Sequence, residues 1–362
     1  MPGGPAARSC GRPLGLAGPE VLDPRWRPPL GVTVGRPFVA VQLGGDARVP
    51  DPAAGGGGRL GGDELAVPGC VVAGVASGDQ LPADPPALDL LLTDHPDPPA
   101  PWVGCPDLAA ALGRLESACE RAPLAATTLV ELLRLSPRLT VPAALVAESL
   151  AYGMLQAGPE HRRWLEGRRA HQSPVRPKAT RPPVVIERHG DELSVLLDRP
   201  EVHNAYDSAM RDGLVEALQL AVADPTLARV VLRGAGRSFC SGGDLDEFGS
   251  APDGATAHAV RMAAGAARWL YRCADRVRVE VHGACIGAGL ELAALAGEVV
   301  AAADSSFSLP EVQMGLVPGA GGTASLPRRA ARQRVAYLGI TGVAVDAMTA
   351  AAWGLVDEVV GG

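Results

Sequence analysis

Two glutamates in the second half of the sequence have surroundings that suggest a chemical role for their carboxylates. Glu291 lies in "AGLELAALAGE", a predicted helix that is apolar nearly all round and is therefore expected to be buried. Glu311 lies in "FSLPEVQMGLVPGAGG", directly after Pro310 and before a glycine-rich stretch at 319–322. A buried carboxylate is costly unless it is paired, neutralised or used, and two together could carry acid–base catalysis. The alternatives are a salt bridge from Glu291 to a buried arginine and a helix N-terminal position for Glu311.

Two glycine-bearing loops each follow a predicted buried strand. The first, 239–244, reads "FCSGGD" after the strand "ARVVLRGA", and the second, 283–289, reads "GACIGAG" and opens the helix of Glu291. Open α/β sheets bind ligands at loops that follow the carboxyl ends of parallel strands. Backbone N–H groups from two such loops could converge on one oxygen and form an oxyanion hole. Each loop could equally be a tight turn, because glycine serves both purposes.

The elements that must position these residues begin near residue 184. The stretch "PVVIERHGDELSVLLDRP" predicts a β-hairpin with its turn at His189 and Gly190, and "SAMRDGLVEALQLAVAD" predicts an amphipathic helix. Further strands are predicted at 277–283 and within "EVVAAADSSFSL". Strands that alternate with helices indicate a mostly parallel sheet with crossover helices, so the fold class is α/β.

The first half of the chain has a different texture. Short buried strands are predicted at 37–43, 70–76 and 87–93, with a flexible tract at 50–62 and a Pro/Gly-rich start at 1–31. Helical periodicity follows, with Asp107 as a predicted N-cap and Pro142 in a predicted first turn. We therefore predict four parts: a poorly defined N-terminal region with short strands and flexible tracts at 1–100, a helical segment at 101–170, a linker at 171–183 and an α/β core at 184–362.

Composition excludes several classes of protein. The net charge of the 362 residues is −7 and no basic block is interleaved with aromatic residues, which argues against a nucleic-acid partner. Seven cysteines without a CxxC pair favour a reducing compartment and no zinc site. No signal peptide or membrane-spanning stretch is recognisable, so we expect a cytoplasmic protein without a membrane partner. His282 and the two cysteines nearest the loops, Cys240 and Cys285, are better explained by packing than by catalysis.

The motifs together resemble one family. "RSFCSGGDLDEF", "VHGACIGAGLELAALA" and "FSLPEVQMGLVPGAGGTASLPR" are similar to the enoyl-CoA hydratase/isomerase, or crotonase, superfamily over about residues 183–360. The resemblance implies a spiral of ββα units that binds acyl-CoA or acyl-carrier thioesters. It also implies a homo-oligomer, either a trimer or a dimer of trimers. Coenzyme A would be part of the substrate, and no other cofactor and no metal is expected.

The resemblance also assigns roles to residues. It implies that the N–H groups of Ser241 and Ala288 form the oxyanion hole, although relatives commonly carry glycine at the second position. It implies that Glu291 and Glu311 are the catalytic pair. The other residues expected to contact substrate are Gly242, Gly243, Asp244, Leu245, Gly287, Gly289 and Gly319. Both glutamates favour an acyl-CoA hydratase. The alternatives are an isomerase, a dehydratase or another enolate-chemistry enzyme on a specialised acyl thioester, and a non-catalytic partner subunit.

One feature departs from the family pattern. Relatives continue past "GLVDEVV" with helices, whereas residues 107–169, which end in "PEHRRWLEGRR", resemble that carboxyl-terminal part. We therefore predict that the family's carboxyl-terminal helices are permuted to the N-terminal side, with 171–183 as the joining linker. Trp164 and Leu165 should then contact the core. The alternative is an unrelated Ala/Leu-rich helical domain.

Overall fold

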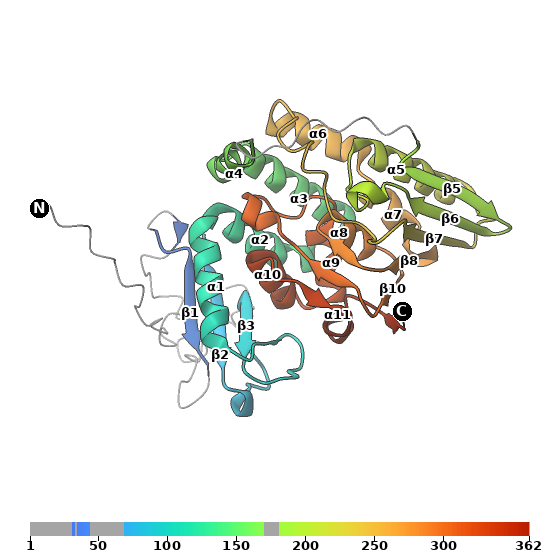
Figure 1. Cartoon of the computed structure of the whole chain (residues 1–362). Coiled ribbons are helices and arrows are strands. Elements are labelled where there is room, and N and C mark those ends of the chain that lie inside the picture. Colours follow the sequence, from blue (N-terminus) through green and yellow to red (C-terminus); the bar gives the residue numbers. More distant parts are fainter. Residues whose placement is uncertain (1–30, 33–34, 44–68, 170–180, 362) are drawn as a thin grey trace, which may run out of the picture.

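The computed structural model describes residues 31–32, 35–43, 69–169 and 181–361, which form an α/β fold (Figure 1). The predictions for 1–31, for the flexible tract at 50–62 and for most of the linker fall outside the described residues. In the described part the strands form three sheets, of four, six and three strands. Helices α1 and α2 lie beside the four-stranded sheet, and α3 and α4 lie further along, on the side of α6 (Figure 1).

The four-stranded sheet contains the three strands predicted in the first hundred residues. It is parallel throughout and consists, in spatial order, of β1 (Phe38–Gln42), β2 (Val71–Ala76), β3 (Leu90–Thr93) and β4 (Val103–Gly104). The strand predictions are confirmed, but β4 was missed. Its two residues lie between Pro101 and Pro106, where the sequence reads as a loop.

Four helices follow β4 and lead to the core. They are α1 (Leu108–Arg121), α2 (Pro123–Leu135), α3 (Val141–Gln156) and α4 (Pro159–Arg169). The predicted N-cap is confirmed, because the carboxylate of Asp107 accepts the N–H of Ala110 at 2.9 Å. Pro142 occupies the first turn of α3, as predicted. Helices α1 and α2 pack against the four-stranded sheet, so this sheet and the helices share one apolar core.

The core beyond residue 183 contains the other two sheets. The six-stranded sheet has the spatial order β13 (Glu358–Val360), β10 (Glu298–Ala302), β8 (Val277–Val281), β7 (Arg229–Gly234), β6 (Glu192–Leu197) and β5 (Val184–His189). The predicted hairpin is confirmed, since β5 and β6 pair antiparallel and Gly190 takes a positive φ of 66° in the turn. The three-stranded sheet has the order β12 (Val345–Asp346), β11 (Ser306–Ser308) and β9 (Ala284–Ile286).

Successive turns of the chain give one strand to each of these sheets and then a helix. Thus β8 is followed by β9 and α8, and β10 by β11 and α9, which is the predicted spiral of ββα units. The helices of this part are α5 (Ser208–Ala223), α6 (Gly254–Ala264), α7 (Ala267–Arg272), α8 (Ala288–Ala293), α9 (Gly322–Arg329), α10 (Arg332–Thr341) and α11 (Ala347–Trp353). This repetition brings the loop after β7 and the start of α8 to the same edge, because Cys240 and Cys285 form a parallel bridge.

The helical segment packs directly on this core. Helices α1 and α2 contact α10, and α3 contacts α6 and α9. The ring of Trp164 lies 5.7 Å from that of Phe248, and a side-chain atom of Leu165 lies 2.9 Å from where a Cβ on Gly249 would be. The expected contacts of Trp164 and Leu165 with the core are therefore confirmed. The permutation itself concerns chain order relative to other proteins, and it stays a prediction.

The closest approach between the two parts lies where α3 meets α6. A Cβ on Gly153 would lie 2.7 Å from the carbonyl oxygen of Gly254, so glycine lets the two backbones touch. We expect Gly153→Ala to destabilise the protein by about 1–3 kcal/mol, because the added methyl group must push α3 away from α6. Urea unfolding monitored by circular dichroism measures the change.

Gly113→Ala provides the matched control. Gly113 lies inside α1, and nothing approaches within 4 Å of a Cβ placed there. Alanine should therefore stabilise the protein by up to about 1 kcal/mol through helix propensity alone. Equal stabilisation by both substitutions would contradict the close packing of α3 on α6.

Candidate active site

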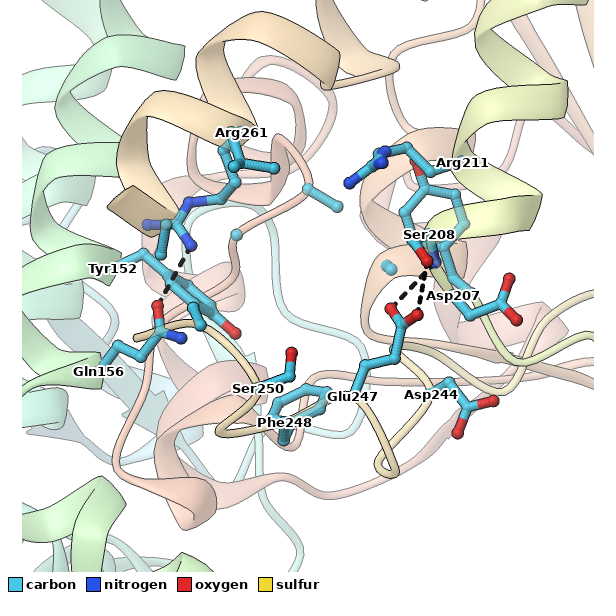
Figure 2. A pocket seen from close by; sticks show the side chains of 18 of the residues that line it. Tyr152, Gln156, Asp207, Ser208, Arg211, Asp244, Glu247, Phe248, Ser250 and Arg261 are labelled. Atoms are coloured by element: carbon cyan, nitrogen blue, oxygen red, sulfur yellow. Dashed lines mark hydrogen bonds between the residues drawn. The ribbon is translucent and has the colours of Figure 1, made fainter. Parts of the chain in front are cut away.

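The two predicted glutamates line one cavity of about 510 Å³. Figure 2 shows this cavity with other residues of its wall labelled. The core and the helical segment both contribute to its wall. The core residues discussed below are Gly243, Ala288, Glu291, Glu311 and Gly319, and the residues from α3 and α4 are Tyr152, Gln156 and His161. The cavity thus joins the predicted carboxylate pair, residues from both glycine-bearing loops and the glycine-rich stretch that begins at 319.

Glu291 is 2% exposed and is held by backbone N–H groups. Its Oε2 accepts the N–H of Ala320 at 2.6 Å and the N–H of Gly322 at 2.9 Å. No arginine in the described part of the chain pairs with it, so the salt-bridge alternative is wrong. Burial raises the pKa of Glu291 above its ordinary value, although the N–H groups of Ala320 and Gly322 act to lower it.

A third buried glutamate, Glu148, binds the loop at 320–323 from the side opposite Glu291. Its Oε1 accepts the N–H of Gly321 at 2.7 Å, and its Oε2 accepts both the N–H and the hydroxyl of Thr323 at 2.7 Å. Burial raises the pKa of Glu148 above its ordinary value, and the charge of Glu291 raises it further. Sequence analysis missed this residue. The signal was the same as for Glu291, namely a single carboxylate in an apolar helix.

Glu311 differs from the other two because one of its oxygens has no partner. It is the first residue of the short 3-10 helix η8 (Glu311–Met314), so the predicted helix N-terminal position is also correct. It is 8% exposed, and its Oε2 makes no hydrogen bond within the described residues. Burial raises its pKa well above the ordinary value, and the charge of Glu291 raises it further. A Cβ on Gly287, where φ is 49°, would collide with Oε1 of Glu311, so the site requires glycine there.

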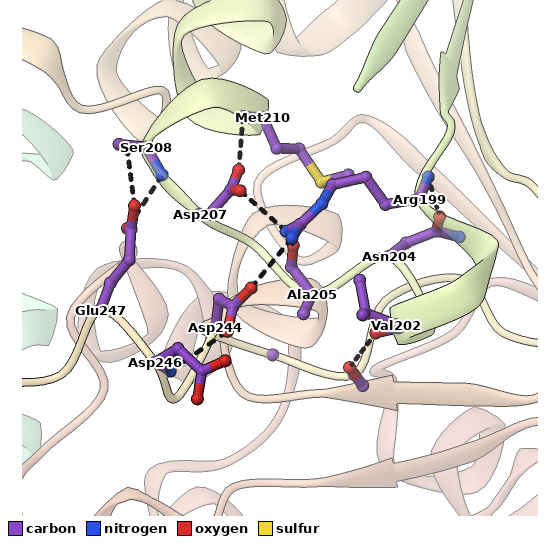
Figure 3. Close-up of polar contacts among 12 residues, drawn as sticks. Arg199, Val202, Asn204, Ala205, Asp207, Ser208, Met210, Asp244, Asp246 and Glu247 are labelled. Atoms are coloured by element: carbon purple, nitrogen blue, oxygen red, sulfur yellow. Dashed lines mark hydrogen bonds and ion pairs between the residues drawn. The ribbon is translucent and has the colours of Figure 1, made fainter. Parts of the chain in front are cut away.

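The prediction that the N–H of Ser241 faces the substrate is wrong. That N–H donates to the carbonyl oxygen of His203 at 2.9 Å, and Ser241 does not line the cavity of the two glutamates. Its hydroxyl donates to the carbonyl oxygen of Val202 at 3.4 Å (Figure 3). Consecutive N–H groups in an extended loop point to opposite sides, and the neighbouring N–H of Cys240 donates to Ala284 on the other side.

Gly243 provides the free N–H that Ser241 lacks. The groups that flank it are used, since the carbonyl of Gly242 accepts from Tyr206 and the N–H of Asp244 donates to Tyr206. The N–H of Gly243 itself has no backbone acceptor in the described part of the chain, and Gly243 lines the cavity. Ala288, the first residue of α8, lines it too and presents an N–H that no intrahelical bond uses. These two N–H groups are the pair that the cavity brings together.

Asp244 fixes the loop after β7. Its Oδ2 lies 3.0 Å from a guanidinium nitrogen of Arg199, which also pairs with Asp207 at 3.0 Å (Figure 3). The other carboxylate oxygen of Asp244 accepts the N–H of Asp246 at 3.1 Å. The side chain of Arg199 is 11% exposed, so this ion-pair group is largely shielded from water. Asp244 lines the cavity, but these contacts give its carboxylate a structural role.

A second cavity, of about 460 Å³, meets the first one at the two glycine-bearing loops. Both cavities are lined by Gly243, Asp244, Phe248 and Glu311. Of the residues predicted to contact substrate, the second cavity also includes Gly242, Leu245 and Gly287, and the first includes Gly319. Gly289 lines neither cavity, because it packs against Cys240, whose Cβ lies 2.8 Å from where a Cβ on Gly289 would be. The two cavities therefore lie next to each other, with Gly243 and Glu311 in the wall of both.

Other reactive residues near the site are occupied by packing. Cys240 and Cys285 are buried, and burial raises the pKa of both thiols, so neither is poised as a thiolate. His282 has its Nε2 3.0 Å from the carbonyl oxygen of Gly236.

Among the described residues no group of three His, Cys, Asp or Glu side chains could hold a metal ion. None of the helices in the described ranges has the length and apolar character needed to cross a membrane.

The raised pKa of Glu311 predicts a pH dependence of stability. The unfolded carboxyl titrates at about pH 4.3, whereas the folded one keeps its proton to higher pH. Unfolding therefore releases a proton above about pH 5, and the free energy of unfolding contributed by this group falls as pH rises toward the folded pKa. Glu311→Gln cannot titrate, so the stability of the wild type relative to this variant should fall from pH 5 to pH 8. Urea unfolding at four pH values measures it.

Glu358→Gln is the control for this measurement, because Glu358 is an exposed glutamate in β13. Its stability difference from the wild type should change little over the same pH range. Parallel stability curves for the wild type and Glu311→Gln would show that Glu311 ionises normally in the folded protein.

The part of the chain that contains Glu291 and Glu311 is also the part that is similar to known proteins. Residues 192–362 match the family model described as enoyl-CoA hydratase/isomerase. A 2,3-dehydroadipyl-CoA hydratase of Escherichia coli is 32% identical over 176 residues, which cover 49% of this chain and 68% of that protein. A 1,2-epoxyphenylacetyl-CoA isomerase of Escherichia coli is 37% identical over 174 residues, covering 46% and 66%.

A solved structure is also similar. The crystal structure of enoyl-CoA hydratase from Thermoplasma volcanium is 35% identical, with a TM-score of 0.46, and the match covers 50% of this chain and 72% of that one. The chain thus spans about two thirds of the length of the curated relatives it matches. Because the Escherichia coli hydratase is 32% identical and the match covers 68% of it, the chain belongs to the enoyl-CoA hydratase/isomerase family, which is also called the crotonase superfamily.

Proposed function

We propose that this protein is an acyl-CoA hydratase that adds water across the double bond of a 2-enoyl thioester. The observation that carries the proposal is the pair of buried carboxylates, Glu291 and Glu311, in one cavity with the N–H groups of Gly243 and Ala288. The two relatives above are named for CoA thioesters, one as a hydratase and the other as an isomerase. A thioester substrate therefore agrees with both the family and the cavity.

The two N–H groups would bind the thioester oxygen. As water adds to the β-carbon, negative charge moves onto this oxygen to give an enolate, which two fixed donors in a buried site stabilise. In this arrangement the acyl chain would occupy the cavity of the glutamates. The coenzyme A or carrier part would follow the second cavity, which begins at Gly243 and Glu311.

The surroundings of the two glutamates suggest a division of labour. Two N–H groups on Glu291 favour its charged form, so it would act as the base that takes a proton from the attacking water. Glu311 has an unpartnered oxygen and a raised pKa, so it would hold a proton and deliver it to the α-carbon. Water thus gives its hydroxyl to the β-carbon, Glu291 gains a proton, and Glu311 loses one until solvent restores both.

Two other functions use much of the same chemistry. An isomerase or dehydratase would need the same N–H pair, and one of the relatives is an isomerase. A non-catalytic partner subunit would need Glu291 only to hold the loop at 320–322, and it would have no use for Glu311, whose buried unpartnered oxygen would then only destabilise it. The products distinguish these functions: a hydratase adds one water to the mass of a 2-enoyl-CoA, an isomerase moves its double bond, and a partner subunit leaves it unchanged.

We also propose that the helical segment takes the place of the family's carboxyl-terminal helices and that the chain forms homo-oligomers. Support for the first comes from the packing of α1–α3 on the core and from Glu148, which α3 gives to the loop at 320–323. Support for the second comes from the outer side of α3, which exposes Leu150 and Met154. Light scattering after gel filtration tests the oligomer.

The first functional prediction concerns the carboxylates. Glu291→Gln and Glu311→Gln should each lower kcat for 2-enoyl-CoA hydration by about 10²–10⁴-fold, because each removes one proton-transfer group. Equilibrium binding of a saturated acyl-CoA should change much less. Mass spectrometry of the product in ¹⁸O-labelled water measures the reaction directly. Full hydration by both variants would exclude the proposed mechanism.

The second functional prediction concerns the oxyanion hole. Ala288→Pro removes one N–H at a helix position that tolerates proline, and it should lower kcat by about 10²–10³-fold. Ala288→Gly keeps the N–H and should retain most activity. Ser241→Ala should also be mild, because the N–H of Ser241 is bonded to His203. Equal kcat values for the proline and glycine variants would show that this N–H is not used.

A further inference from the structure

The cavity of the glutamates contains a cation that the proposed hydration does not use. Arg261 lies on α6 and lines the cavity (Figure 2). Its Nε donates to the hydroxyl of Ser149 at 3.2 Å, and one terminal nitrogen donates to the carbonyl oxygen of Ser149 at 3.1 Å. The other terminal nitrogen donates to Oε1 of Gln156 at 3.4 Å. All three acceptors are neutral.

No carboxylate in the described part of the chain forms an ion pair with Arg261. The guanidinium is half-buried and lies over the ring of Tyr152, 4.3 Å from its centre. Burial lowers the pKa of Arg261 from its ordinary value, which reflects the cost of desolvating the cation, although the charges of Tyr152 and Glu148 act to raise it. The stacking and the three hydrogen bonds fix the guanidinium plane before any ligand arrives.

The donor count leaves room for one carboxylate. A guanidinium has five N–H groups, and the three hydrogen bonds use the Nε–H and one N–H on each terminal nitrogen. One N–H on each terminal nitrogen remains. Each of these remaining N–H groups can donate to an oxygen of a carboxylate, and hydrogen bonds between a guanidinium and a carboxylate are among the strong ones.

Apart from the two glutamates, the other charged side chains that line the cavity have partners of their own, although Arg211 keeps one terminal nitrogen free within the described residues. Arg211 pairs with its exposed neighbour Asp212 at 2.7 Å. Asp207 and Asp244 both pair with Arg199, and the exposed Glu247 accepts the N–H and the hydroxyl of Ser208. Tyr206, Arg211, Arg261, Gly319 and Ala320 also line a smaller cavity of about 110 Å³, which extends the first one behind the two arginines.

We propose that Arg261, assisted by Arg211, binds a carboxylate at the far end of the acyl group, so that the substrates are thioesters of dicarboxylic acids. This subsite rests on the proposed function for the position of the thioester at Gly243 and Ala288. It lies at the part of the cavity formed by α3, α5 and α6, where Figure 2 places Tyr152 and Gln156 beside Arg261 and Arg211 across the cavity from them. Arg261 would select the substrate without taking part in proton transfer.

Binding measurements test the subsite independently of turnover. Isothermal titration calorimetry compares the CoA thioesters of hexanedioic and octanedioic acid with those of hexanoic and octanoic acid, none of which can be hydrated. We expect at least one diacid thioester to bind ten-fold or more tightly than its matched monoacid. Equal affinity within both pairs would overturn the proposal, and this comparison needs only the wild-type protein.

Variants then assign the preference to Arg261. Arg261→Gln should bring the affinity ratio close to one, and Arg261→Lys, which keeps the charge but not the two remaining N–H groups, should give an intermediate ratio. Arg272→Gln is the control, because Arg272 is exposed on α7 and stacks on Trp269 away from both cavities. If Arg261→Gln does not fold, the lysine variant decides. An unchanged ratio in a folded Arg261 variant would overturn the assignment.

Hydration assays separate failure of the subsite from failure of the proposed function. The substrates are the 2-enoyl-CoA thioesters of the six-carbon diacid and monoacid. A diacid binding preference without hydration of either substrate would support the subsite and contradict the hydratase. Hydration of both substrates without a binding preference would support the hydratase and overturn the subsite.

Discussion

The site depends on one short loop that two buried glutamates hold from opposite sides. The N–H groups of residues 320–323 alternate between them: Ala320 and Gly322 donate to Glu291, whereas Gly321 and Thr323 donate to Glu148. A buried carboxylate needs hydrogen-bond donors and a buried N–H needs an acceptor. The N–H groups of the loop and the carboxylates on α3 and α8 meet both needs. An unpartnered buried polar group costs about 1–3 kcal/mol, which makes any other arrangement of these three elements unfavourable.

The hydrogen bonds of this loop connect the part of the chain that matches the family model with a part that precedes the match. The family model matches residues 192–362, yet Glu148, Tyr152 and Gln156 come from α3, before the match begins. Helix α3 fixes the loop beside Glu291 and also forms the wall next to Arg261. In the proposed function, substitutions in α3 and α6 would change the substrate preference while the motifs around Glu291 and Glu311 stay as they are.

Sequence reasoning found the features that depend on local pattern. Alternating strands and helices gave the fold class, the Asp107 cap was correct, and the apolar helix around Glu291 indicated a buried carboxylate. It failed where the answer depends on distant partners. The direction of the Ser241 N–H is set by His203, and the role of Glu148 is set by N–H groups more than 170 residues further along the chain. No local pattern contains either contact, so only the folded arrangement could reveal them.

The same loop also decides which carboxylate carries a proton. Glu148, Glu291 and Glu311 are all buried, and each charge raises the cost of the next one. The N–H groups of the loop stabilise the charges of Glu148 and Glu291, whereas Oε2 of Glu311 receives no hydrogen bond within the described residues. A proton shared among the three is therefore held best by Glu311. The hydrogen bonds that position the loop thus also make Glu291 the base and Glu311 the acid of the proposed reaction, without any further charged residue.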